Sequence, residues 1–125
     1  MHANRQEIPV MFEGDGIESR QTRWGDMNVA IEMAPTGMDS RPLFEGLPGN
    51  SCQCPHWGYV ISGRMRVVYA DHEEVVSAGE AYYLEPGHNV VCEEAGELVE
   101  FSPGDEYQKT MQMVAENMQA ARADV

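Results

Sequence analysis

The sequence predicts an all-β fold, a sandwich or a barrel, followed by one helix. Short strand-like segments follow one another at close spacing, and turn residues such as Gly, Asp and Pro separate them. In the clearest segment, apolar and polar side chains alternate with a period of two, as they do in a strand with one buried face. At 125 residues, of which 42% are hydrophobic, the chain is long enough for one core, so we expect a single domain over residues 1–125.

The first third of the chain carries three of the expected strands. A short edge strand near residues 8–12 precedes two glycines, and a loosely alternating segment at 18–24 ends in the turn Gly25-Asp26. The clearest segment follows, in which Met27, Val29, Ile31 and Met33 alternate with Asn28, Ala30 and Glu32. We expect the apolar set to form its buried face.

An irregular connection and six further strands complete the expected sheet. Residues 34–50 are rich in Pro, Gly, Asp and Ser, and connections of this length often act as lids or rims over a site. Strands are expected at 56–62, 64–70, 73–76, 81–84, 88–92 and 98–101. The turns between them are expected at Ser62-Gly63, Asp71-His72, Ala78-Gly79, Pro86-Gly87 and Ala95-Gly96.

The C-terminal segment changes to a helical pattern. Ser102, Pro103 and Asp105 supply an N-cap, a proline at the first helical position and an acid in the first turn. Apolar residues then recur at intervals of three and four: Tyr107, Met111, Val114, Met118 and Ala121. We expect an amphipathic helix that packs this stripe on the outside of the barrel or on a second subunit. A methionine-lined helix can also form the wall of a flexible ligand site.

The charge balance limits the partners. With 21 acidic and 8 basic residues the net charge is −13, and such a surface repels phosphate backbones and anionic lipids. Neither nucleic acid nor a membrane is therefore expected as a partner. No apolar run approaches the length of a membrane span, and the first residues lack the pattern of a signal peptide, so we expect a soluble cytoplasmic protein. Three cysteines do not make a disulfide framework, and in a reducing compartment they are free thiols or metal ligands.

The run Cys52-Gln53-Cys54-Pro55-His56-Trp57-Gly58-Tyr59 is the most informative stretch of the sequence. If it is extended, Cys52, Cys54 and His56 point to one face. Two thiols and an imidazole suit a soft or borderline divalent metal such as zinc, iron, copper or nickel. A second strand offers His88, Val90 and Cys92 on one face. Two strands of one barrel would then direct two histidines and up to three cysteines into a shared interior.

The glycine spacing carries a resemblance to a known family. Residues 27–103 resemble a cupin domain, a small double-stranded β-helix of jelly-roll type, with Gly63 matching the last glycine of the first cupin motif. Gly79 and Gly87 match the two glycines of the second motif, and the separation of 15 residues between the motifs resembles that of compact microbial members. The Cys-x-Cys-Pro-His-Trp-Gly-Tyr run is similar to that of small single-domain bacterial cupins. The resemblance implies a barrel at about 27–103, a helix at about 103–122, a small-molecule ligand and a homodimer.

The metal ligands of the family are not reproduced. The cupin motifs supply three histidines and a glutamate, but His56 stands at the position of the glutamate. Asn50 and Cys52 stand at those of the first two histidines under one spacing of the motif, and Gly49 and Ser51 under the other. Val90, which cannot bind a metal, stands at the position of the third. A metal in this chain therefore needs a different set of ligands, His56 and His88 with Cys52 or Cys54.

Four further residues are candidates for a functional role, and each can instead have a purely structural one. Glu100 lies in the apolar run 98–101, where a carboxyl group is either exposed at an edge or buried with a raised pKa that suits proton transfer. Trp57, Tyr83 and Cys92 are candidates for lining a pocket, although aromatic residues and cysteine are often core residues. The histidines can likewise be buried and hydrogen-bonded, or cap a turn, without a ligand.

Three functions fit these residues. The first is a metalloenzyme in which a divalent ion polarises a small oxygenated substrate. The second is a metal-free module that binds a small molecule at the barrel mouth, which the loss of the usual ligands favours. The third gives the cysteines a redox role. The sequence does not choose between them.

Overall fold

Seven antiparallel strands and one long helix make up the fold, which the computed structural model describes for residues 1–123, with side chains described to residue 120. The strands are β1 (Val10–Gly14), β2 (Ile17–Trp24), β3 (Met27–Ala34), β4 (His56–Val68), β5 (Glu73–Ser77), β6 (Ala81–Leu84) and β7 (Asn89–Pro103). The helix is α1 (Gly104–Ala123), and three short 3₁₀ turns are η1 (Arg5–Glu7), η2 (Arg41–Phe44) and η3 (Pro48–Asn50). The all-β fold with a C-terminal helix is thus confirmed.

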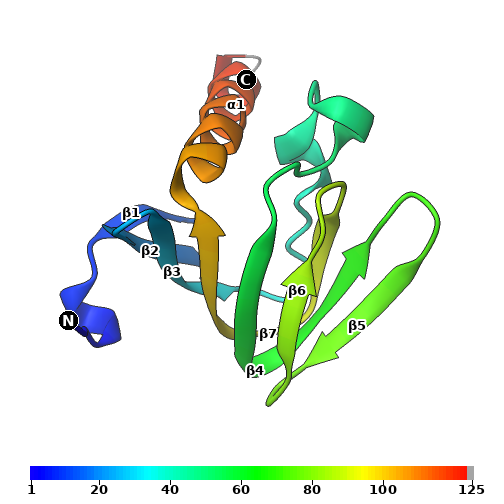
Figure 1. The fold of residues 1–125 in the computed structure, drawn as a ribbon. Coiled ribbons are helices and arrows are strands. Elements are labelled where there is room, and N and C mark those ends of the chain that lie inside the picture. The colour runs from blue at the N-terminus through cyan, green and yellow to red at the C-terminus, as the bar shows by residue number, and fades with distance from the viewer. Residues whose placement is uncertain (124–125) are drawn as a thin grey trace.

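The strands form one curled sheet in the order β1-β2-β3-β7-β4-β5, with β6 paired to β4 beside β5. Strand β4 pairs with β6 through its first half and with β5 through its second half. Strand β7 is central, because it pairs with β4 on one side and with β3 on the other. The sheet bends so that β1–β3 and β4–β6 form two walls (Figure 1).

Two expected turns are absent, because β4 runs without interruption through Ser62-Gly63 and β7 through Ala95-Gly96. Gly63 and Gly96 lie where the β4–β7 register shifts. An added Cβ at Gly96 would lie 1.9 Å from the carbonyl oxygen of Ser62, and one at Gly63 would lie 2.5 Å from that of Glu94. The glycines expected to reverse the chain instead allow two bent strands to approach closely.

Strand β3 contributes side chains of both alternating sets to the interior: Val29 of the apolar set is buried and Met33 lines the cavity. Asn28 and Glu32, the polar set, line the interior cavity with Ser19 and Gln21 of the neighbouring strand β2. The expectation that the apolar set is buried holds at Val29, but polar side chains of the other set are covered as well, because the barrel encloses a partly polar cavity.

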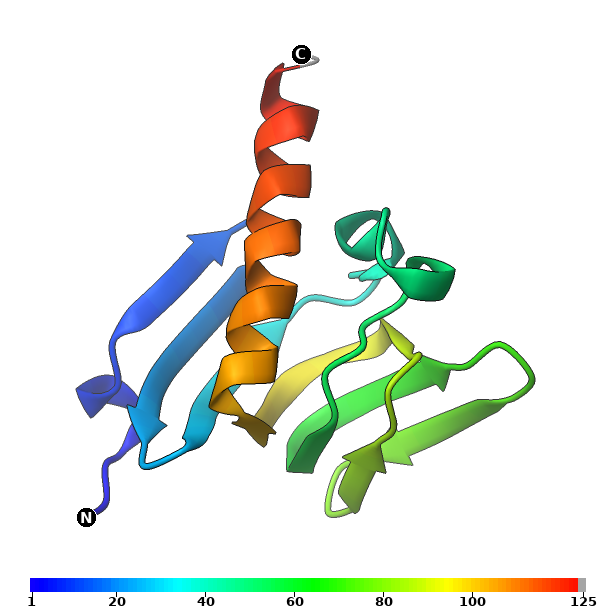
Figure 2. The same ribbon diagram turned by 45° about the horizontal axis from the view of Figure 1, so that its top comes forward.

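Helix α1 and the connection between β3 and β4 cover one end of the barrel (Figure 2). A buried cluster joins them, formed by Phe44, Cys52, Cys54, Tyr107 and Val114, with Met111 and Met118 packed against it. The amphipathic stripe therefore packs on the barrel, except that the side chain of Ala121 lies outside the described residues. Within residues 1–123, no helix combines the length and the apolarity that a membrane crossing requires.

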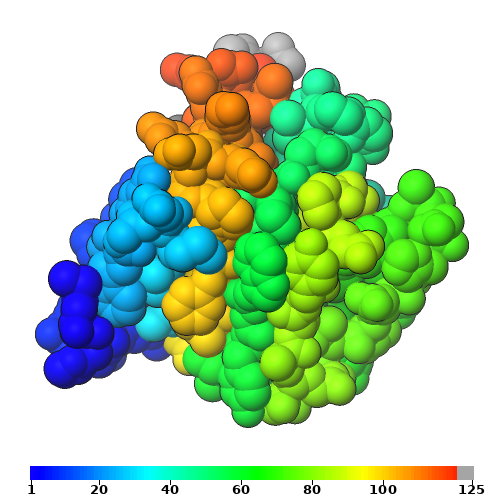
Figure 3. All heavy atoms as spheres, viewed as in Figure 1, coloured from blue at the N-terminus to red at the C-terminus, as the bar shows by residue number. Residues whose placement is uncertain are grey.

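The outer face of β6, β4 and β7 carries exposed aromatic side chains. Tyr83, Trp57 and Phe101 stand side by side in the strand register, and their exposed fractions are 46%, 44% and 38%. The Trp57 and Tyr83 rings stack with centroids 5.1 Å apart. The surfaces of these strands adjoin one another below α1 (Figure 3).

Candidate metal centre

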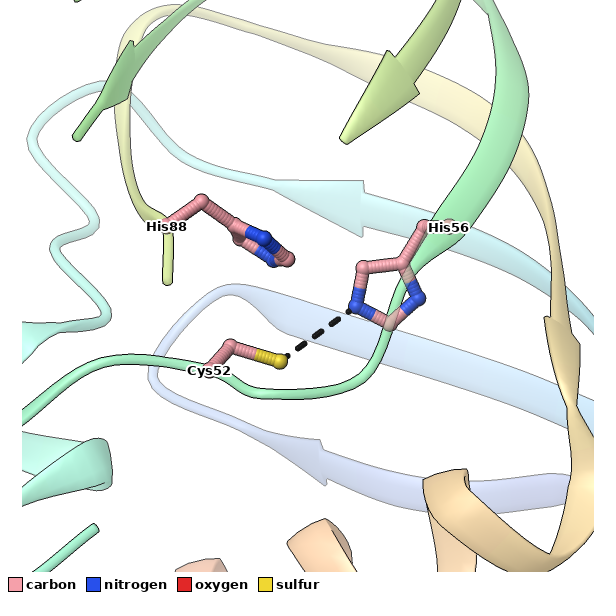
Figure 4. A group of neighbouring side chains, drawn as sticks. All are labelled: Cys52, His56 and His88. Carbon is pink, nitrogen blue, oxygen red and sulfur yellow. Dashed lines mark hydrogen bonds between the residues drawn. The ribbon is translucent and has the colours of Figure 1, made fainter. Parts of the chain in front are cut away.

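Backbone pairing brings three donor side chains to one point inside the barrel. Cys52 and His88 form an isolated antiparallel bridge, in which the Cys52 N–H donates to the His88 carbonyl at 2.8 Å and the Gly87 N–H to the Cys52 carbonyl at 2.7 Å. His56 begins β4 and pairs with Leu84 of β6. The three side chains point toward one another (Figure 4).

The three donors are close and buried. Cys52 Sγ lies 3.5 Å from His56 Nε2, and the imidazole rings of His56 and His88 have centroids 5.0 Å apart at an angle of 70°. One ligand atom from each of the three side chains lies within 4.8 Å of the others. Zinc bonds of about 2.0–2.3 Å in a tetrahedron would place such donors roughly 3.3–3.6 Å apart. The pair Cys52 Sγ and His56 Nε2 already has this separation, and a metal would bring the other donor atoms closer by up to about 1.5 Å.

Hydrogen bonds orient both imidazole rings. The Nδ1 of His88 lies 2.6 Å from the carbonyl oxygen of Glu85, which can only accept, so this nitrogen carries the proton and Nε2 is the free donor atom. The Nδ1 of His56 lies 2.6 Å from Ser102 Oγ, which leaves its Nε2 toward Cys52. A metal-binding histidine commonly has this second contact at its other nitrogen.

Burial keeps the donors uncharged. It lowers the pKa of both His56 and His88 to about 4, so both rings are neutral at pH 7, the state that binds metals. It raises the pKa of the Cys52 thiol to about 12, so metal binding there requires the release of a proton. The high pKa of Cys52, and an equally high one for Cys54, give no support to a reactive thiolate in the redox reading.

The structure does not bring Cys54 into this group. Residues 51–55 are irregular rather than extended, so the alternation expected from Cys52 to His56 does not hold. Cys54 is fully buried in the cluster below α1, and its thiol donates to the Pro55 carbonyl at 3.5 Å.

A buried carboxyl group adjoins the donors. Glu100 Oε2 lies 3.6 Å from His56 Nδ1, and Glu100 Oε1 accepts a hydrogen bond from the Tyr82 hydroxyl at 2.9 Å. Tyr82, Gly58 and Glu100 are register partners on β6, β4 and β7, and Tyr82 crosses the strand at the glycine. Burial raises the pKa of Glu100, as expected of a buried acid in this apolar run.

Two further residues of the site, Glu32 and Ser102, were not predicted from the sequence. Glu32 lines the same cavity and accepts a hydrogen bond from Ser19 Oγ at 2.7 Å, and its pKa is raised by burial and by the nearby Glu100. Ser102, expected to cap the helix, instead contacts His56. The sequence offered one signal for Glu32, an acidic residue inside the predicted strand at 27–33. Its pairing with Ser19 is known only from the structure.

A cavity of about 810 Å³ connects these groups. Cys52, His56, His88 and Glu100 line it, and so does Cys92, which was expected at a pocket. Trp57 and Tyr83 do not line this cavity, contrary to expectation. They adjoin the inward residues His56 and Leu84 along their strands, so their side chains point to the outer face.

The comparisons with known proteins concern the fold. No family model and no curated protein matches the sequence. Among solved structures, an RmlC-like cupin from Shewanella frigidimarina is 16% identical, with a TM-score of 0.59, over 81% of this chain and 88% of that one. The polyketide cyclase RemF from Streptomyces resistomycificus is 16% identical, with a TM-score of 0.61, over 83% and 79%. A variant of Bacillus subtilis oxalate decarboxylase is 16% identical, with a TM-score of 0.57, over 78% of this chain and 28% of that one. The chain therefore has the cupin fold.

Proposed function

We propose that this protein binds a divalent transition metal through Cys52 Sγ, His56 Nε2 and His88 Nε2, and acts on or senses a small molecule in the adjoining cavity. The observation that carries the proposal is that one ligand atom from each of these three buried side chains lies within 4.8 Å of the others. One sulfur and two imidazole nitrogens suit zinc, iron, copper or nickel rather than magnesium or calcium.

The surroundings support this set of donors. Backbone hydrogen bonds form the bridge between Cys52 and His88. The backbone positions of these two residues therefore do not depend on the conformation of their side chains. The ring nitrogen that each histidine does not use is held by a neighbour. A tetrahedral ion bound by three residues keeps a fourth position, as catalytic zinc sites do, and here all three donors line the cavity.

Bound metal would supply Lewis acidity toward an oxygen of the small molecule. Glu100 would supply the proton transfer, because its raised pKa allows it to hold a proton near neutral pH and to release one. The hydroxyl of Tyr82 fixes Oε1 of this carboxyl group, while Oε2 faces His56. Ser102 and the Glu85 carbonyl hold the two rings in place.

Metal binding can be tested without knowing a reaction. The full chain, stripped with a chelator, is titrated with zinc by calorimetry and with cobalt(II) by absorption spectroscopy, in which a thiolate ligand produces a near-ultraviolet charge-transfer band. We expect one ion per chain and a thiolate band. Cys52→Ala and His88→Gln should each weaken zinc binding by about a hundredfold or more.

Cys92→Ala is the matched control. Cys92 also lines the cavity and is buried, but it does not belong to the three-donor group. Its removal should leave the zinc affinity and the cobalt band unchanged. Weak binding that is the same in wild type and Cys52→Ala would refute the proposal.

The competing function is a metal-free module for small-molecule binding. It is favoured by the contact of Cys52 Sγ with His56 Nε2, which satisfies both side chains without an ion. Stabilisation by organic compounds together with no specific metal binding would establish this function instead.

A further inference from the structure

The cavity beside the three donors is larger than a very small ligand requires. Its volume of about 810 Å³ lies in the upper part of the range of roughly 300–1,000 Å³ that ligand pockets span. Pockets of this size enclose drug-sized molecules. A six-heavy-atom dianion such as oxalate would leave most of the space to water. The volume therefore fits a ligand built on two or more rings.

Methionine side chains form much of the apolar wall. Six of the nine methionines line the cavity: Met11, Met33, Met38, Met65, Met111 and Met118. The methionine side chain is flexible and polarizable, so it adapts to an irregular or flat apolar ligand and makes favourable contacts with aromatic rings. Phe44 of η2 adds an aromatic surface. This wall selects an apolar, preferably aromatic, body.

The polar part of the wall disfavours anions. Glu32 and Glu100 both line the cavity, whereas the only Lys or Arg side chains among the described lining residues are Arg23 and Arg64. Arg23 is paired with Asp105 at 3.1 Å and Arg64 with Glu93 at 3.5 Å. An anionic ligand would therefore lie near two carboxyl groups without a free cation to pair with. Neutral hydroxyl groups, in contrast, can donate to the carboxyl oxygens.

One donor in the cavity wall lacks an acceptor. The Nδ2 of Asn28 is buried, and within the described residues it makes no hydrogen bond. Asn28 lines the cavity and is the register partner of Ser102, the residue that contacts His56. A buried amide of this kind is costly unless a ligand or water oxygen accepts from it.

We infer that the cavity binds a neutral, hydroxylated compound of two or more fused rings, with hydroxyl groups toward Glu32 and Glu100, an oxygen at Asn28 and the rings against the methionines. This inference concerns the ligand class of the proposed site, so its catalytic meaning rests on the proposed function. Binding of the ring body does not depend on the proposed function, because the methionine wall and the polar wall exist without a metal.

The test compares three probes on metal-free and zinc-loaded protein by calorimetry. They are 2,7-dihydroxynaphthalene, its anionic analogue 7-hydroxy-2-naphthoate, and oxalate. We expect the diol to bind both forms, about tenfold or more tighter than the naphthoate on metal-free protein. Oxalate should not bind the metal-free form.

Two substitutions on α1 locate the probe. Met111→Trp fills the cavity and should abolish diol binding. Met113→Trp, on the same helix but not in the cavity wall, should not. Glu32→Gln should reduce the preference for the diol over the naphthoate several-fold, and circular dichroism checks that each variant folds.

The possible failures are distinguishable. If zinc binds through Cys52, His56 and His88 but the naphthoate binds metal-free protein as tightly as the diol, or neither binds, the ligand class is refuted and the metal proposal stands. If the diol binds with the expected selectivity but no metal does, the ligand class stands and the metal proposal fails. The wild-type selectivity decides the ligand class even if a tryptophan variant does not fold.

Discussion

Replacing Gly58 with alanine should destabilise the fold strongly. A Cβ at this position would lie 2.4 Å from Cζ and Oη of Tyr82 and 2.5 Å from the backbone oxygen of Val99. The backbone oxygen belongs to a paired central strand and cannot move freely, so Tyr82 must be displaced. Overpacking of this kind costs about 1–3 kcal/mol, and losing the Tyr82 hydrogen bond to buried Glu100 adds about 1–3 kcal/mol. We expect a loss of about 3 kcal/mol in the free energy of unfolding, a large part of the stability of a small domain.

Urea denaturation of metal-free protein measures this loss, provided that the slope of free energy against urea is unchanged. Gly14→Ala is the control, because a Cβ there would meet only the ring of Phe12 at an ordinary 3.7 Å, and it should change stability by less than about 1 kcal/mol. Tyr82→Phe isolates the hydrogen bond and should cost about half as much as Gly58→Ala. If Gly58→Ala lowers the free energy of unfolding no more than the control does, Tyr82 does not need the space above this glycine. The proposed role of Gly58 in the contact between Tyr82 and Glu100 is then refuted.

Three further predictions concern protons and assembly. Since burial lowers the pKa of His88 to about 4, below the ordinary value near 6.5, the unfolded chain binds more protons between these values and stability falls with acidification. In metal-free protein, His88→Gln should therefore gain stability relative to wild type, by up to about 3 kcal/mol, as the pH falls from 6.5 to 4; a constant difference would contradict the lowered pKa. Glu32 has the opposite sign, because its raised pKa makes the folded state bind more protons above pH 4.5. Glu32→Gln should thus stabilise by about 2–3 kcal/mol more at pH 8 than at pH 5, measured by urea denaturation. Finally, the exposed aromatic face is the surface on which the homodimer expected from the cupin resemblance would form. Trp57→Lys should convert that dimer to a monomer in light scattering, whereas a lysine at exposed Val75 of β5 should not.

The strand segments, the C-terminal helix and the inward direction of His56 and His88 follow from local pattern, whereas the place of Cys52 depends on its bridge to His88. Alternation within 56–62 and 88–92 is a property of the strands themselves, so it survives folding. Cys54 could not be placed in this way, because residues 51–55 are irregular and a period of two has no meaning there. Gly63 was misread because a glycine with positive φ looks the same in a turn and at a bend between paired strands.

The inward side of the barrel was harder to predict than its strands. Hydrophobic alternation identifies the buried face only when the interior is apolar. Here Glu32 and Asn28 face inward because the interior is a cavity with a polar wall, and Trp57 and Tyr83 face outward although they are aromatic. Which face of each strand is inward depends on pairings between segments far apart in the chain. Local patterns in a single sequence do not reveal these pairings.

The way in which the donors are held makes fold and metal binding separable. Cys52 and His88 are positioned by backbone hydrogen bonds, which persist when the side chains are changed. His56 differs, since its ring contacts Ser102 and lies against Glu100, so removing it takes a partner from two buried polar side chains of β7. A variant at Cys52 should therefore report chiefly on the metal, whereas His88→Gln also removes the hydrogen bond of the ring to the Glu85 carbonyl and changes the pH dependence of stability. A variant at His56 reports on the metal and on the β4–β7 packing together, and loss of metal binding there is evidence for coordination only when the variant retains the wild-type free energy of unfolding.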